Sequence, residues 1–160
     1  MKILVLSDSH GRDDYLAAIV YDNLDCDTII HLGDGEHDFD LISDLPEMKQ
    51  KTIYQVRGNC DFSSDLPITR FENIGGYAFY LTHGYVQHVK YGVEYLMLDA
   101  QKNHRNVALF GHTHKPYENY YDGVYLFNPG AVCNGRYGKI EIKDGSILFS
   151  HGKLRKMDTF

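Results

Sequence analysis

The sequence predicts an α/β protein with two stacked mixed β-sheets flanked by helices, a four-layer αββα sandwich. Three observations predict this fold. Continuous apolar runs near the start are typical of buried parallel strands, alternating runs further on are typical of antiparallel strands, and segments of helical periodicity lie between them. Because the chain has 160 residues, we expect a single domain that spans residues 1–160.

The first part of the chain indicates parallel strands joined by a helical connection. Apolar runs occupy residues 2–8, 26–34 and 51–59, and polar side chains follow at their ends. A helix is predicted after the first run, because apolar residues recur there at the spacing of one helical face. These residues are Leu16, Ile19, Val20 and Leu24.

The second part of the chain indicates hairpins around a further helix and a buried strand at 106–114. Gly75-Gly76, Asp122-Gly123 and Asp144-Gly145 supply the positive φ angles of tight turns. A helix is predicted over residues 87–102, with one apolar face. That face consists of Val89, Val93, Leu96, Met97 and Ala100.

A second apolar stripe lies beside this helical face. It consists of Tyr91, Tyr95 and Leu98. Such a stripe fits either the interface of a homo-oligomer or ordinary burial beneath a loop.

Charge and composition exclude several classes of protein. The formal net charge of −6 argues against a general nucleic-acid binder, so no long nucleic-acid track is expected. No run approaches the ~20 apolar residues of a membrane helix, and the start has no room for a signal peptide, so we expect a cytoplasmic protein without a membrane partner. Cys26, Cys60 and Cys133 lack a CxxC pair, which fits reduced thiols.

The polar residues at the strand ends are all of metal-ligand type. They are Asp8, His10, Asp34, Asn59, His83, His112 and His114. The separations from residue 8 to 34, from 34 to 59, from 59 to 83 and from 83 to 112 are 26, 25, 24 and 29 residues, about one strand and its return connection each. Since the carboxyl ends of parallel strands converge, we expect these side chains to meet. Seven ligands are too many for one tetrahedral zinc ion and suit two adjacent ions that share a carboxylate.

The motifs DSHG, GD, GNCD, THG and GHTH, in this order, resemble the calcineurin-like metallophosphoesterase superfamily. The small size, GNCD and FNPGAV resemble its compact bacterial and archaeal phosphodiesterase branch, over residues 3 to about 150. The resemblance implies the two-sheet sandwich and a division of the ligands between two ions. It assigns Asp8, His10 and His114 to the first ion, Asn59, His83 and His112 to the second, and Asp34 to both.

Carboxylate, amide and imidazole donors suit two divalent ions, with Mn²⁺ favoured and Ni²⁺, Fe²⁺ and Zn²⁺ as alternatives. We expect a phosphodiesterase that acts on a small phosphodiester through in-line attack by a metal-bridging hydroxide. Asn59 and His83 are the main catalytic candidates. Ser9, Asp61 and Thr113 are either groups that orient the ligands or ordinary turn residues.

Cys60 occupies the position where many members of the superfamily have a histidine that protonates the leaving oxygen. A nucleophilic cysteine is disfavoured, because the sixth residue after it is Leu66 where Cys-x5-Arg requires arginine. As a metal ligand, Cys60 would compete with the adjacent Asn59. A thiol is a poor substitute for imidazolium, so we expect weak general-acid help and a preference for good leaving groups.

Several other side chains are candidates for the substrate end of the site. Replacement acids are His31, His37 and His88, with a plain surface histidine as the alternative for His37. Arg12, Tyr85, Tyr117 and Arg136 are candidates for shaping the pocket.

Two rival functions stay open. A eukaryotic vacuolar-sorting subunit resembles this fold and uses it as a protein-binding scaffold with a degraded metal site, whereas this chain keeps every expected ligand. The other rival is a nuclease or a cyclic-nucleotide phosphodiesterase, and net acidity argues only against a long nucleic-acid substrate.

Overall fold

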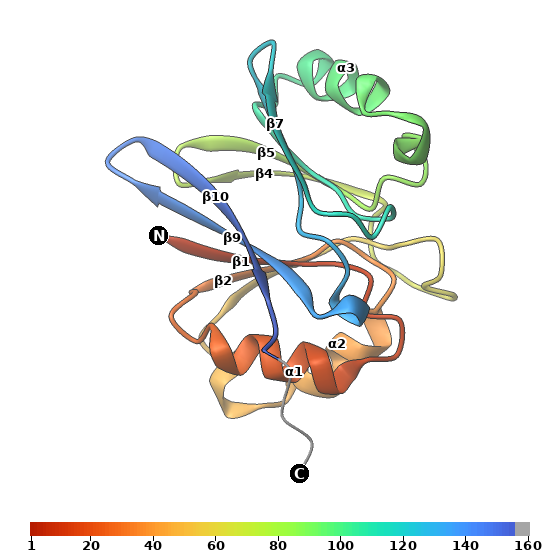
Figure 1. The fold of residues 1–160 in the computed structure, drawn as a ribbon, viewed down its shortest axis with the longest axis vertical. Coiled ribbons are helices and arrows are strands. Elements are labelled where there is room, and N and C mark those ends of the chain that lie inside the picture. The colour runs from red at the N-terminus through yellow and green to blue at the C-terminus, as the bar shows by residue number, and fades with distance from the viewer. Residues whose placement is uncertain (156–160) are drawn as a thin grey trace.

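The computed structural model describes residues 1–155, which form two five-stranded sheets (Figure 1). Sheet A contains, in spatial order, β10 (Ser146–Lys153), β9 (Arg136–Lys143), β1 (Lys2–Leu6), β2 (Thr28–His31) and β3 (Thr52–Gln55). Sheet B contains β4 (Thr69–Ile74), β5 (Tyr77–Thr82), β6 (Val107–Leu109), β8 (Val124–Asn128) and β7 (Tyr117–Tyr121).

Helices cover the outer faces of both sheets. Helices α1 (Asp13–Asp22) and α2 (Glu36–Ser43) pack on sheet A, and α3 (Glu94–Lys102) packs on sheet B. Short 3-10 turns are η1 (Pro46–Met48), η2 (Val89–Tyr91) and η3 (Val132–Asn134). This arrangement confirms the predicted four-layer αββα sandwich. A single domain over residues 1–160 stays a prediction, and residues 156–160 lie outside the described part.

Strand direction follows the apolar patterns of the sequence. Strands β1, β2 and β3 pair in parallel, as their continuous apolar runs predicted. The β9–β10 hairpin joins this sheet through an antiparallel pairing of β9 with β1, which makes sheet A mixed. In sheet B, β5, β6 and β8 are parallel, and the hairpins β4–β5 and β7–β8 form its edges.

The predicted hairpin turns are confirmed. Gly75 and Gly76 join β4 to β5 with φ angles of 60° and 88°, which suits a type I′ turn. Both Asp-Gly pairs also adopt positive φ angles between their strands.

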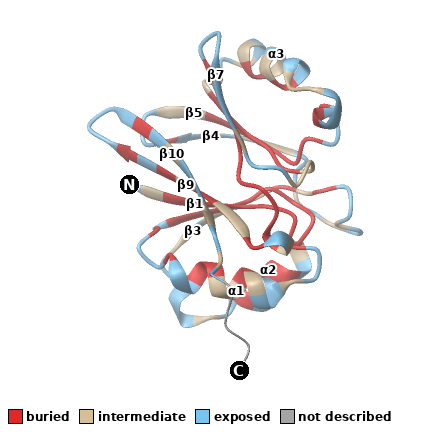
Figure 2. Cartoon of the chain, viewed as in Figure 1, coloured by how far each residue is buried: buried red, intermediate tan, exposed pale blue. Residues whose placement is uncertain are grey.

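The main apolar core lies between the two sheets (Figure 2). Val5 and Ile30 from sheet A meet Phe79, Leu109 and Phe127 from sheet B, and all five are almost completely buried. Two further clusters hold the helices, with Leu16 and Phe39 against sheet A and Leu96 and Ala100 against sheet B. The two sheets therefore pack face to face. The loops that follow their strands are left to form a site at one edge.

The predicted helix over residues 87–102 is wrong at its start. Residues 89–91 form the turn η2, and α3 begins only at Glu94. Gly92 breaks the helix with a φ of 132°, far from the helical value near −63°. The predicted apolar face still packs inward, because Val89 and Val93 join the cluster beneath α3.

Two other differences concern helices. Helix α1 ends at Asp22, so Leu24 is exposed and does not belong to its apolar face. Helix α2 was not predicted, because only Phe39 and Ile42 mark its buried face and the helix is short. Within residues 1–155 no helix is long and apolar enough to cross a membrane.

The stripe of Tyr91, Tyr95 and Leu98 is fully on the surface. All three side chains are exposed, so burial beneath a loop is wrong for them. A homo-oligomer that covers the stripe stays a prediction.

His31 at the end of β2 is an internal histidine. Its Nδ1 accepts a hydrogen bond from Gly33 N at 3.1 Å, which places the ring proton on Nε2, 3.3 Å from the Ser9 hydroxyl. Burial lowers the pKa of His31 to about 4. His31 is therefore neutral near pH 7 and does not serve as a replacement acid.

We expect Phe79→Ala to lower the free energy of unfolding by about 3–5 kcal/mol, because it opens a cavity between the sheets. Phe62→Ala is the matched control: Phe62 is 87% exposed, so its loss should change the free energy by less than about 0.5 kcal/mol. Urea unfolding measures both, and equal effects would contradict the assigned core.

We expect the stabilising effect of His31 relative to His31→Asn to shrink by up to about 3 kcal/mol as pH falls from about 7 to about 4. Between pH 6.5 and about 4, His31 binds a proton in the unfolded chain but not in the native protein, so acid favours unfolding. Asparagine keeps an acceptor for Gly33 and does not titrate. Urea titrations of both proteins with chelator present measure the difference, and parallel pH profiles would refute it.

Candidate metal centre

The loops that follow the strands converge at one edge of the two sheets. Asp8, Asp34 and Asn59 follow β1, β2 and β3 in sheet A, while His83 and His112 follow β5 and β6 in sheet B. Backbone hydrogen bonds tie these loops together. Asp8 N donates to Gly33 O at 2.9 Å, His10 N to Asp34 O at 3.1 Å, and Gly111 N to His83 O at 2.9 Å. The predicted convergence of strand ends is thus present in the backbone.

The backbone of this edge adopts an uncommon conformation. Five candidate ligands have positive φ angles: 58° at Asp8, 44° at His10, 60° at Asp34, 69° at His112 and 63° at His114. For residues other than glycine this region costs roughly 1–3 kcal/mol each, and such strain clusters at functional sites. This backbone conformation directs the polar side chains toward one another, which indicates a functional constraint.

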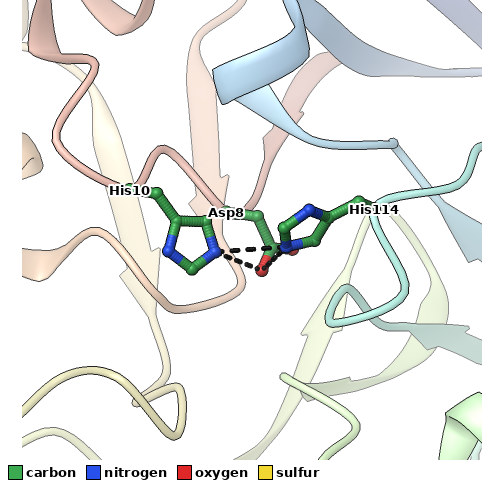
Figure 3. A group of neighbouring side chains, drawn as sticks. All are labelled: Asp8, His10 and His114. Carbon is green, nitrogen blue, oxygen red and sulfur yellow. Dashed lines mark hydrogen bonds and ion pairs between the residues drawn. The ribbon is translucent and has the colours of Figure 1, made fainter.

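A first cluster consists of Asp8, His10 and His114 (Figure 3). Asp8 Oδ1 lies 3.3 Å from His10 Nε2 and 3.2 Å from His114 Nε2. The two imidazole nitrogens are themselves only 3.1 Å apart. All three donor atoms lie within 4.8 Å of one another, so one cation could contact all of them.

The Asp8 carboxylate is completely buried, and only one of its two oxygens accepts hydrogen bonds. Its Oδ2 accepts hydrogen bonds from the Ser7 hydroxyl at 2.6 Å and from His112 N at 3.0 Å. Its Oδ1 has no hydrogen-bond partner among the described residues. A buried anionic oxygen without a donor is costly unless a cation compensates it, so this observation fits a metal site.

A second cluster consists of Asp34, His83 and His112. His83 is buried, and its Nδ1 donates to Leu32 O at 2.7 Å, so Nε2 is the nitrogen that carries the lone pair when the ring is neutral. That Nε2 has no hydrogen-bond partner among the described residues. It lies 3.1 Å from Asp34 Oδ2, so a neutral ring presents a lone pair to a shared cation.

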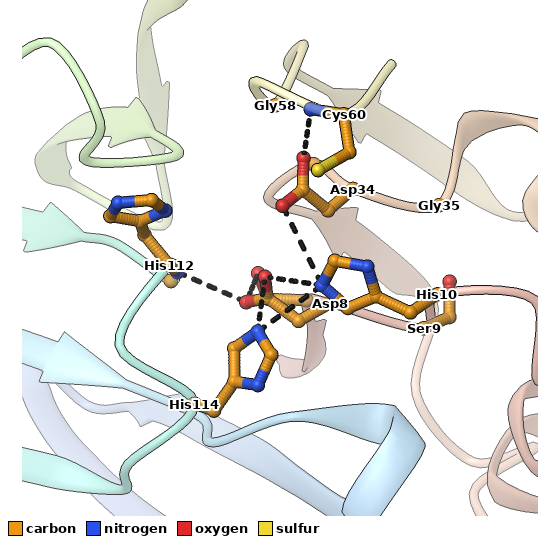
Figure 4. A network of polar contacts seen from close by, with 12 residues as sticks. Asp8, Ser9, His10, Asp34, Gly35, Gly58, Cys60, His112 and His114 are labelled. Carbon is orange, nitrogen blue, oxygen red and sulfur yellow. Dashed lines mark hydrogen bonds and ion pairs between the residues drawn. The ribbon is translucent and has the colours of Figure 1, made fainter.

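Asp34 belongs to the second cluster and also contacts His10 of the first cluster (Figure 4). Its Oδ1 accepts a hydrogen bond from Cys60 N at 2.7 Å. Its Oδ2 faces His83 Nε2 at 3.1 Å and His10 Nε2 at 3.6 Å. This central position suits the predicted role of Asp34 as a bridge between two ions, which stays a prediction.

Asn59 lies at the same edge. Together with His83 it lines a cavity of about 490 Å³. Its amide nitrogen approaches the Cys60 sulfur at 3.6 Å, which leaves the amide oxygen for another contact. The side chain is therefore available for its predicted role as a ligand.

Asp61 holds the loops in place. Its carboxylate accepts four backbone hydrogen bonds: from Asp34 N and Gly58 N at 2.8 Å each, from Gly35 N at 3.0 Å and from Glu36 N at 3.1 Å. It thereby joins the loops after β2 and β3 and receives the first amides of α2, where a negative charge is favoured. Asp61 is placed to position Asp34.

The other two predicted orienting residues contact different groups. The Ser9 hydroxyl contacts His31 Nε2, and the Thr113 hydroxyl accepts from Asn128 Nδ2 at 3.1 Å. Sequence analysis missed Ser7 and Asn128. Ser7 could have been noticed as the hydroxyl that precedes Asp8, whereas Asn128, which also donates to Gly111 O at 3.0 Å, is brought close only by the fold.

Electrostatics couple the two clusters. Burial opposes ionisation of Asp8, but His10, His114 and the charge of His83 hold the pKa of Asp8 well below its ordinary value. The nearby Asp8 carboxylate raises the pKa of His10. Burial opposes, but does not cancel, the rise that Asp34 and Asp8 cause in the pKa of His83. A bound divalent ion would displace these protons, so its affinity should fall at acid pH.

Cys60 is exposed and its sulfur lies close to His10 and Asp34. Burial and the nearby Asp34 carboxylate raise the pKa of the Cys60 thiol, which favours the neutral form. His37 and His88 are both exposed, and His37 shares a second cavity of about 390 Å³ with Cys60.

Of the four candidates for shaping the substrate end of the site, only one lies at the cavity that Asn59 lines. Tyr85 lines the Asn59 cavity and packs edge to face on His112, with ring centroids 5.5 Å apart. Arg12 pairs instead with Asp14 at 2.9 Å, and Tyr117 lines a different cavity. Arg136 does not line the Asn59 cavity.

Comparison with known proteins agrees with this geometry. The model of the calcineurin-like phosphoesterase superfamily domain matches residues 1–145. The probable metallophosphoesterase YsnB of Bacillus subtilis is 29% identical over 142 residues, which cover 88% of this chain and 80% of YsnB. The phosphodiesterase MJ0936 of Methanocaldococcus jannaschii is 27% identical over 151 residues, which cover 83% of this chain and 85% of MJ0936.

Solved structures share the fold. A Streptococcus pneumoniae protein described as a predicted phosphoesterase has a TM-score of 0.78 and 26% identity, and the match covers 95% of this chain and 88% of that one. Vps29 of Entamoeba histolytica in complex with Zn²⁺ has a TM-score of 0.74 and 20% identity over 96% of this chain and 99% of Vps29, a likeness of fold alone. The chain therefore belongs to the calcineurin-like phosphoesterase superfamily, in its compact bacterial and archaeal branch.

Proposed function

We propose that this protein is a dinuclear metal-dependent phosphodiesterase that hydrolyses a small phosphodiester. The observation that carries the proposal is the pair of buried atoms without hydrogen-bond partners, Asp8 Oδ1 and His83 Nε2, which face the centre of the site. A metal-dependent hydrolase is the activity of the superfamily to which the chain belongs. A relative named as a phosphodiesterase supports the diester.

The donor sets divide into two sites. Asp8, His10 and His114 would hold one ion, and His83, His112 and Asn59 the other, with Asp34 contacting both. Two divalent ions supply a bound water of lowered pKa and neutralise charge on the phosphoryl oxygens. Carboxylate, amide and imidazole donors suit Mn²⁺, with Fe²⁺, Ni²⁺ and Zn²⁺ as alternatives.

The surrounding residues fix these ligands rather than react themselves. Leu32 O holds the ring of His83, Ser7 and the amide of His112 hold Asp8, and Asp61 holds the backbone of Asp34. Such outer contacts keep a ligand in its productive orientation. No side chain is required as a nucleophile, and the neutral Cys60 thiol is a weak proton donor for the leaving oxygen.

The scaffold and nuclease alternatives have less support. The Vps29 likeness concerns the fold alone, whereas the family model and the relatives named as phosphoesterases support the enzyme. The cytoplasmic location expected from the sequence and the single-domain organisation stay predictions. A nucleotide-derived diester remains compatible with the proposed activity.

We expect that chelation abolishes hydrolysis and that Mn²⁺ restores it, with a phosphodiester preferred over a monoester that carries the same p-nitrophenolate leaving group. The release of p-nitrophenolate measures both rates. Asp8→Asn is the control that keeps the shape of the side chain, and it should lower the rate at least ~10²-fold by weakening the site. Clear monoester preference would refute the phosphodiesterase, and inactivity with every divalent ion would refute the enzyme.

We expect Cys60→His to raise turnover, and to raise it most for substrates with poor leaving groups, because imidazolium supplies general-acid help worth ~10²–10⁴-fold. The slope of log kcat against leaving-group pKa measures this effect. Cys60→Ser removes the sulfur without adding an acid, so its slope should match that of the parent protein. An unchanged slope in Cys60→His would count against the idea.

A further inference from the structure

A cavity with an apolar wall adjoins the proposed metal centre. It measures about 490 Å³, within the usual ~300–1,000 Å³ of small-molecule pockets. Asn59 and His83 are among its lining residues, so the cavity adjoins two expected metal ligands. Any ester group on a phosphorus atom held at these ligands has this space within reach.

The outer wall of this cavity consists of large apolar side chains that are open to solvent. They are Phe62, Ile68, Tyr85 and Val86, with exposed fractions of 87%, 41%, 57% and 52%. Single exposed apolar side chains are normal, but four around one cavity suggest a ligand that covers them. Two of them are aromatic and can pack against a flat ring.

Tyr85 links this wall to the metal centre. Its ring packs edge to face on His112, and the ring of His112 packs on His83 with centroids 5.1 Å apart. Tyr85 is thus held by one proposed ligand, His112, which itself packs on His83, while more than half of the surface of Tyr85 is exposed. A ring already held in this way loses little conformational entropy when a ligand packs on it.

Arg57 adds a charge to the same cavity. Its guanidinium donates a hydrogen bond to Ser64 O at 3.4 Å, and among residues 1–155 it has no carboxylate within 4.0 Å. It is half-buried, so its free donors are available to an acceptor in the cavity.

We propose that this cavity binds an aromatic ester group of the phosphodiester, with the ring packed against Phe62 and Tyr85 and an acceptor on its edge directed toward Arg57. The inference rests on the proposed function and names the substrate class. A simple aryl ester and a nucleoside ester share this chemistry.

The test compares the binding of non-hydrolysable probes of equal charge to the Mn²⁺-loaded protein by calorimetry. Methyl(phenyl)phosphinate, whose phosphorus carries two P–C bonds and no ester bond, should bind about tenfold more tightly than dimethylphosphinate, because the phenyl ring packs on the aromatic side chains. Phe62→Ala and Tyr85→Ala should each bring this ratio toward one. Tyr95→Ala is the matched control, a tyrosine 60% exposed on α3, and should keep the ratio.

One further probe tests whether an acceptor on the edge of the ring interacts with Arg57. Another tests whether the ring belongs to a simple aryl ester or to a nucleoside ester. A 4-carboxyphenyl probe should gain affinity over phenyl, and Arg57→Gln should remove that gain; no gain would overturn the role given to Arg57. A methylphosphinate joined by a P–C bond to C5′ of 5′-deoxyuridine has no ester bond to cleave. Tighter binding than phenyl supports a nucleoside ester, and weaker binding supports a simple aryl ester.

Failure of this inference differs from failure of the proposed function. Equal affinity for the methyl and phenyl probes, in a protein that hydrolyses a diester with Mn²⁺, would overturn the aromatic subsite alone. Binding of neither probe, together with no metal-dependent hydrolysis, would overturn both.

Discussion

The arrangement of the site depends on the buried carboxylate of Asp8. Ser7 and the amide of His112 satisfy one oxygen, and the other faces His10 and His114 without a hydrogen bond. An ionised buried group needs compensation by charge, which imidazolium or a divalent ion can provide. Since the donors come from loops of both sheets, the sandwich has to bring these loops together before the charge is balanced.

The loops keep their strained shapes because backbone contacts over-determine them. Asp61 gathers amides from the loops after β2 and β3, and a Cβ on Gly58 would overlap the Asp34 carboxylate. Small side chains and one anchored carboxylate thus permit the positive φ angles of Asp34 and its neighbours. The geometry of the proposed metal centre is a property of these loops, and the sheets supply their fixed ends.

Sequence patterns predicted the layers and the approach of six of the seven candidate ligands, because strand periodicity and polar strand ends are local signals. Their roles as ligands, and that of Asn59, stay predictions. They did not predict the break at Gly92, since the apolar spacing continues across it while only the backbone changes. His31 was a candidate replacement acid in the sequence, because its burial depends on tertiary packing, including the contact with Phe39 of the unpredicted helix α2. Contacts between residues far apart in the chain, such as Asn128 with Gly111, leave no local pattern.

In the proposed phosphodiesterase, Cys60 and the cavity lined by Asn59 and Phe62 favour the same property of the substrate. A neutral thiol gives little help to a leaving oxygen, so the oxygen has to depart largely unaided, as a phenolate does more readily than an alkoxide. Phe62, two residues after Cys60, lines both the Asn59 cavity and the cavity that contains Cys60. The loop that contains Cys60 and Phe62 therefore supplies no strong acid to the leaving oxygen and provides an apolar surface for a flat ring. A substrate whose aromatic group is also its leaving group would satisfy both constraints, since the ring that binds would also stabilise the departing charge.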